Sequence, residues 1–151
     1  MGTRSRIGIR NADDTVDSIY CHWDGYPEHN GRLLVEHYTD QAKVRELIAL
    51  GDLSSLGEEI GVKHPFDTHD FPGGYDKYNQ LYGKMCTAYG RDRGETAVDA
   101  EHSHSVDAFL RIDCGAEYYY IFHYGRWMVR SGSNWVLVED VLQAKAEDQE
   151  A

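Results

Sequence analysis

Hydrophobic and polar residues alternate in two stretches near the start of the chain, residues 6–10 and 15–23. A period of two is typical of a strand with one buried face. The short segment between the stretches is rich in Asn and Asp, which favour turns. We therefore predict a β-hairpin, and its alternation places His22 and Trp23 on opposite faces of the sheet.

The spacing of apolar residues becomes helical after this hairpin. It predicts one helix over residues 28–38, with Pro27 at the first helical position. A second helix is predicted over residues 40–50, with Thr39 as its N-cap. A Ser and a Glu at capping-box spacing predict a further helical turn over residues 55–60.

The middle of the chain is less regular. Residues 61–75 contain prolines, glycines and aspartates and are predicted to form a long loop, and loops of this length are usually functional or mobile. Residues 84–89 resemble a strand, and residues 90–95 form a charged segment between two glycines that we predict to be a turn. A short helix is expected over residues 106–112.

The C-terminal part has the clearest pattern. Residues 117–124 are apolar or aromatic on both faces, as in a central strand, and residues 127–130 and 135–138 continue a three-stranded meander. A closing helix is expected over residues 140–146. The whole pattern predicts an α+β fold in a single domain, residues 1–151: a mostly antiparallel sheet of about five strands with helices chiefly on one face.

Composition narrows the classes of function. The chain of 151 residues is 41% hydrophobic and 12% aromatic and carries a formal charge of −11, so it should fold but offers no general basic surface for nucleic acid or membranes. The acidity serves solubility, or it mimics nucleic acid towards a basic partner protein. No signal peptide or membrane span is evident, which predicts a cytoplasmic protein. The many aromatic residues are compatible with a homodimer.

Residues 20–31 read Tyr-Cys-His-Trp-Asp-Gly-Tyr-Pro-Glu-His-Asn-Gly and join a predicted strand to a predicted helix. Such a junction directs unpaired backbone N–H groups and the positive end of the helix dipole to one point, which suits a phosphate. The arginines of the 90–95 segment would add forked donors, and tyrosines would stack on a base. The predicted ligand-binding residues are His22, Asp24, Tyr26, His29, Asn30, Tyr89, Arg91 and Arg93.

A structural interpretation competes with this site. Trp23 and Tyr26 would then belong to the core, and Arg91-Asp92-Arg93 would be a solvated hairpin tip. A zinc site made from histidines such as His22 and His29 has no matching compact spacing, so no metal and no cofactor are predicted.

Catalysis is also weighed against binding. The pairs His102-Ser103 and His104-Ser105 overlap in one loop, and Thr68-His69 does not supply a second separate pair, so acid–base cleavage of a phosphodiester is not favoured. Cys21 lies on the buried face of its strand and should be inert as a nucleophile. No catalytic residues are predicted.

Five segments stand out as a set: residues 3–9, 19–31, 47–56 and 88–95, together with the aromatic C-terminal hairpin. They resemble a family of small proteins encoded by bacteriophages and prophages. The resemblance implies no particular activity and no catalytic residues. Small phage proteins of this kind often counter host defences by binding a nucleotide second messenger, by degrading it, or by blocking a defence protein.

These observations lead to one expected function and two alternatives. The leading hypothesis is a phage-encoded binding protein in the host cytosol that sequesters a nucleotide-type signalling molecule. The first alternative is an acidic inhibitor that binds a host defence protein. The second is a phosphodiesterase that cleaves the signal.

Overall fold

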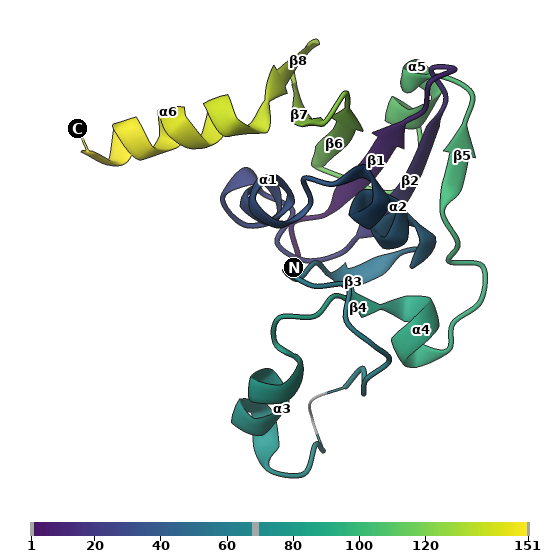
Figure 1. Ribbon diagram of the computed structural model, residues 1–151, viewed down its shortest axis with the longest axis vertical. Helices are drawn as coiled ribbons and strands as arrows, with labels where there is room; N and C mark the ends of the chain where they lie inside the picture. The colour runs from purple at the N-terminus through teal and green to yellow at the C-terminus, as the bar shows by residue number, and fades with distance from the viewer. Residues whose placement is uncertain (1, 68–69, 151) are drawn as a thin grey trace.

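A computed structural model describes residues 2–67 and 70–150 of the chain (Figure 1). The strands are β1 (Ser5–Arg10), β2 (Val16–Cys21), β3 (Leu53–Ser55), β4 (Thr87–Ala88), β5 (Glu101–Ser103), β6 (Tyr118–His123), β7 (Arg126–Ser131) and β8 (Asn134–Leu137). The helices are the π-helix η1 (Pro27–Gly31) and the α-helices α1 (Arg32–His37), α2 (Gln41–Ala49), α3 (Gly74–Tyr82), α4 (Tyr89–Arg93), α5 (Val106–Leu110) and α6 (Val138–Glu150). The predicted α+β class is confirmed.

The strands form one mixed sheet. Their order is β4-β3-β2-β1-β6-β7-β8, and β5 also pairs with β2, which gives eight strands among the described residues. The predicted hairpin of β1 and β2 is present, but β1 runs parallel to β6, and β2 runs parallel to β3. The predicted sheet of about five mostly antiparallel strands is therefore too small. Strands β3, β4 and β5 are two or three residues long, too short to show a hydrophobic period.

The main hydrophobic core lies between one face of the sheet and the helices α1, α2 and the N-terminal part of α6. Ile7, Ile19 and Tyr120, from three neighbouring strands, are buried there against Leu34 of α1 and Val138 of α6. Each buried aliphatic side chain contributes roughly 1.5–3 kcal/mol to folding. The sheet and these helices therefore form a stable platform.

The opposite face of the sheet is covered by one short helix. Phe109 of α5 packs against Val16 and Ile121, and a Cβ at Gly8 would come within 3.2 Å of the Phe109 ring. Since Tyr120 and Ile121 are consecutive in β6, the two clusters lie on opposite faces. Helices are thus concentrated on one face, as expected, while α5 covers part of the other.

Two predicted helices differ from the structure. Residues 27–37 form the π-helix η1 followed by α1, and the second helix is capped by Asp40, whose carboxylate accepts a hydrogen bond of 3.2 Å from the Ala42 N–H. The helical turn predicted over residues 55–60 is wrong, because Ser55 ends β3 and pairs with Thr87 of β4. Sheet pairing overrides the local capping signal there.

The segment between β3 and β4 leaves the sheet and returns to it (Figure 1). Its residues 61–67 and 70–73 lie outside any helix or strand, as predicted for the loop over residues 61–75, and α3 begins at Gly74. The predicted turn over residues 90–95 is wrong as well, since α4 occupies Tyr89–Arg93 and Gly94 ends it with a φ of 77°. This change of local structure reorients the two arginines that the sequence places at the candidate site.

Candidate functional site

The junction after β2 is closed by its own backbone. The N–H groups of His29 and Asn30 donate to the Tyr26 carbonyl at 3.1 Å, and Asn30 N–H also lies 3.3 Å from the Asp24 carbonyl oxygen. Asp24 takes a left-handed conformation, with a φ of 57°, to make this turn. The N–H groups of His29 and Asn30, which were expected to face an anion, are therefore already used within this turn.

Asn30 is a structural residue in this arrangement. Its side chain is fully buried, and its amide nitrogen approaches Ser5 Oγ at 3.4 Å, Cys21 Sγ at 3.5 Å and the Trp23 carbonyl at 3.4 Å. Its Oδ1 atom lies 2.9 Å from Nδ1 of His29. These contacts tie η1 to β1 and β2, so the amide points into the protein and away from any surface ligand.

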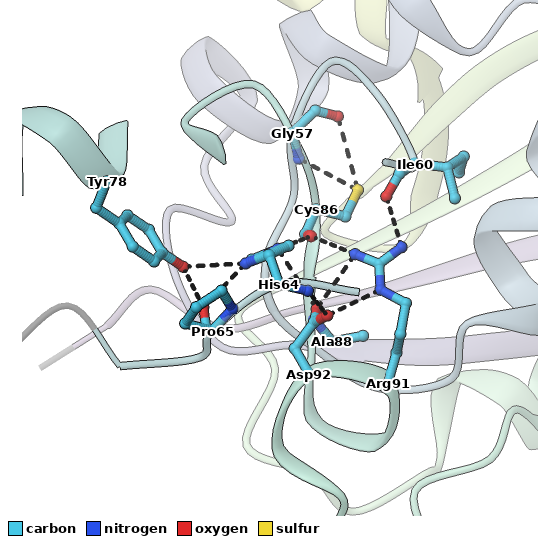
Figure 2. Close-up of polar contacts among 9 residues, drawn as sticks. All are labelled: Gly57, Ile60, His64, Pro65, Tyr78, Cys86, Ala88, Arg91 and Asp92. Atoms are coloured by element: carbon cyan, nitrogen blue, oxygen red, sulfur yellow. Dashed lines mark hydrogen bonds and ion pairs between the residues drawn. The ribbon is translucent and has the colours of Figure 1, made fainter. Parts of the chain in front are cut away.

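Arg91 is also held inside the protein (Figure 2). Its Nη1 donates to the Ile60 carbonyl at 2.8 Å, its Nη2 to the Cys86 carbonyl at 2.7 Å, and its Nε to Asp92 Oδ1 at 3.0 Å. The expectation that the arginines of the 90–95 segment act together as forked donors to a ligand is therefore wrong for Arg91. Residues 89–93 are helical rather than extended, and Asp92 is the internal partner of Arg91.

The Asp92 carboxylate is the centre of this network (Figure 2). Its side chain is fully buried and accepts hydrogen bonds from the backbone N–H groups of Ala88 at 2.8 Å and His64 at 3.1 Å. Burial alone would raise the pKa of Asp92, but the bonds from Arg91, Ala88 and His64 outweigh it and lower that pKa below its usual value. Asp92 therefore remains ionised and links α4 to the segment that carries His64.

His64 connects the network to α3. Its Nε2 lies 3.0 Å from the Cys86 carbonyl, and its Nδ1 lies 2.9 Å from the Pro65 carbonyl and 3.2 Å from the Tyr78 hydroxyl (Figure 2). The imidazole also stacks on Tyr82 of α3, with ring centroids 5.1 Å apart. Sequence reasoning missed His64, and its only signal was a long loop that contains a histidine.

An open groove of about 910 Å³ lies beside this network. It is lined by Trp23, Phe66 and Arg93, with Pro65, Asp67 and Asp92. The Arg93 guanidinium sits 5.0 Å above the Phe66 ring, and Trp23 is 43% exposed. The groove thus combines two aromatic rings with a cation, and its Phe66 wall belongs to the segment that His64 and Asp92 anchor.

The predicted ligand-binding residues are therefore divided. Arg93 lines the groove, Tyr89 packs its ring 5.6 Å from Phe66, and His22 contacts Trp23 edge-on at 4.7 Å. Tyr89 and His22 contact lining residues but do not line the groove themselves, and neither do the other predicted residues: Asp24, Tyr26, His29, Asn30 and Arg91. The alternative that placed Trp23 and Tyr26 in the core is wrong, because Tyr26 is 37% exposed and Trp23 more so.

The buried thiols are unsuited to nucleophilic chemistry. Burial raises the pKa of Cys21 to about 12 and also raises the pKa of Cys86. Within residues 2–67 and 70–150, no three His, Cys, Asp or Glu side chains are grouped so that they could hold a metal ion. The Thr68-His69 pair weighed above lies outside the described residues. No helix in the described part of the chain is long and apolar enough to cross a membrane.

The chain matches no protein-family model, no curated protein and no solved structure. A functional assignment therefore has to come from the residues of the groove and of the network that supports it.

Proposed function

We propose that the protein binds a nucleotide-type ligand in the groove between Trp23, Phe66 and Arg93 and retains it without chemical change. The observation that carries this proposal is the guanidinium of Arg93 stacked on Phe66 beside a second exposed aromatic ring. Aromatic rings stack on bases of any sequence, and a stacked guanidinium still directs its N–H edge at a phosphate.

The other groups in the groove are compatible with the same ligand class. Asp67 supplies a carboxylate, the group that accepts hydrogen bonds from ribose hydroxyls in many nucleotide sites. Asp92 is neutralised by Arg91, so its charge does not oppose a phosphate. Among the described residues, Arg93 forms an ion pair with the half-exposed Glu95, at 3.4 Å, and an exposed pair of this kind is worth little and is readily exchanged.

Binding is favoured over turnover. The buried cysteines have raised pKa values, and the imidazole of His64 is enclosed by its own partners. Together with the resemblance to phage proteins, this supports sequestration of a nucleotide-type signal of the host as the biological role. The protein would then counter host defence in the host cytosol by lowering the free concentration of that signal.

The test is direct. The purified protein is incubated with cyclic and linear nucleotides, freed of unbound material, heated and analysed by chromatography. Intact nucleotide released by heat supports the proposal. Nucleotide fragments would contradict it and would indicate that the protein is a phosphodiesterase. Arg93→Ala should weaken binding by about 1.5–3 kcal/mol, whereas Arg111→Ala, which removes an exposed arginine after α5, should have no effect. Equal affinity of both variants would contradict the proposed site.

The acidic surface supports one alternative. A chain with a charge of −11 and exposed Trp23 and Tyr26 has the properties of an inhibitor that binds a basic surface of a host defence protein. This alternative is favoured if no nucleotide is retained and if a captured partner is released by moderate salt. Light scattering of the free protein reports in the same experiment whether it forms a homodimer.

A further inference from the structure

A second cavity lies at the other end of β1, away from the groove. The groove is lined by Trp23, which comes two residues after Cys21, and Cys21 pairs with Ser5 at the start of β1. The second cavity lies where β1 ends, at Arg10. Its volume is about 180 Å³, well above the roughly 10–15 Å³ that one water molecule needs on the same measure. It is therefore large enough for a phosphate group.

Parallel pairing brings two nitrogen-bearing side chains to this cavity. Ile9 pairs with Phe122, so the next residues, Arg10 and His123, lie side by side where β1 and β6 end. Both line the cavity, and none of the described residues that line it is acidic. In a protein with a charge of −11, a cavity lined by a cation and by no carboxylate is a place where an anion can be attracted locally.

Asp14 already occupies part of the position that an anion would take. Nε and Nη2 of Arg10 both approach its Oδ1 atom, at 3.2 and 3.1 Å. The Asp14 side chain is 72% exposed, so this pair is weak and the carboxylate can move into water. Burial and the nearby Arg10 lower the pKa of His123, whereas Asp14 acts in the opposite direction. An added anion would act in the same direction as Asp14 and raise the pKa of His123.

Tyr124 stands at the edge of the cavity in an unusual conformation. It has a φ of 50°, Gly125 follows with a φ of 77°, and the two make the tight turn between β6 and β7. Asn, Asp or Gly normally takes such a position, because a side chain is strained there. Tyr124 is 91% exposed and gains little packing, while its ring lies 4.1 Å from that of His123. Strain without compensating burial indicates a binding role.

We propose that this cavity is a site for a phosphate monoester, held by Arg10 and His123, with Tyr124 placed to stack on an aromatic group carried by the ester. The site is independent of the groove proposed above. Asp14 acts as a competing internal anion, so removing its charge strengthens binding.

The experiment uses inorganic phosphate as the probe and the histidine side-chain NMR signals as the readout. Phosphate should shift the His123 signals saturably. Arg10→Gln should weaken binding about tenfold or more, because a charged hydrogen bond is lost, and Asp14→Asn should tighten it. Arg111→Gln and Arg93→Ala should leave the titration unchanged, which separates this cavity from the groove. Adenosine monophosphate should bind more tightly than phosphate in the parent but not in Tyr124→Asn, where Asn suits the turn.

Several outcomes would overturn the proposal. They are the absence of a saturable His123 shift, an unchanged titration in Arg10→Gln, or weaker binding in Asp14→Asn. Circular dichroism melting curves accompany each variant. Because the Arg10–Asp14 pair is exposed, the curves of Arg10→Gln and Asp14→Asn should match that of the parent, and a lost titration then reports the site and not the fold.

Discussion

The Asp92 carboxylate provides the most direct test of how the segment between β3 and β4 is fixed. Asp92→Asn keeps the size of the side chain and removes its charge. The carboxylate accepts bonds from Arg91, Ala88 and His64, and an amide nitrogen in place of either oxygen would face one of these donors. Removing one partner of a buried ion pair lowers the free energy of unfolding by about 3–5 kcal/mol. For a chain of this length, that lowers the melting temperature by roughly 6–20 °C.

Urea unfolding followed by circular dichroism measures this loss, and hydrogen exchange of residues 61–88 shows whether the segment opens separately. Glu95→Gln is the matched control, because it removes one charge from the exposed Arg93–Glu95 pair and should cost less than about 1 kcal/mol. If Asp92→Asn proved as stable as this control, and exchange in the segment did not change, the network would not be what fixes the segment.

The loss of stability caused by Asp92→Asn should depend on pH. The pKa of Asp92 is lower in the folded state than in the unfolded state. Its charge therefore stabilises the protein fully at pH values above the unfolded-state pKa of about 3.9. This contribution is lost as the pH falls through the folded-state pKa. The difference in stability between the parent and Asp92→Asn should therefore be constant near neutral pH and decrease below about pH 4.

Two further predictions concern buried positions. Gly31→Leu should lower the free energy of unfolding by about 1–3 kcal/mol in urea, because even a Cβ at Gly31 would lie 3.0 Å from Val138 Cγ1. An unfolding midpoint equal to that of the parent would show that η1 can move away from α6. Iodoacetamide at pH 8 should modify Cys114, which is partly exposed, and leave Cys21 and Cys86 unmodified until the protein unfolds, as peptide mass spectrometry would report.

Much of the sheet could be predicted from the sequence. The hairpin of β1 and β2 and the meander of β6 to β8 have alternating or doubly apolar residues bounded by turn residues, which are local signals. Helix α4 could not be predicted, because Gly90 and Gly94 around three charged residues resemble a turn. Its conformation depends on the burial of Asp92, and that burial depends on a segment almost 30 residues away.

The candidate site was predicted less well, for a related reason. Asn30 and Arg91 have the side chains that ligand sites use, yet their partners include Ser5 and Ile60, which are 25 and 31 residues distant. A sequence shows which groups can form hydrogen bonds but not which are already satisfied in the fold. Arg93 was found because it is polar and remains at the surface, and Phe66 was missed because the loop around it has no periodic pattern.

The parallel pairing of β1 with β6 also constrains how the chain can fold as it is synthesised. Strand β1 is among the first strands to be synthesised, and one of its edges pairs with β6, which lies about 110 residues later in the chain. At roughly 5–20 residues per second, the ribosome supplies that partner many seconds after the hairpin of β1 and β2 has emerged. During this interval the edge of β1 has unpaired N–H and C=O groups, and Ile7 and Ile9 lack the residues of β6 that later cover them. The native sheet can therefore close only after translation has passed β6, and a chain that stops earlier keeps an open, apolar edge.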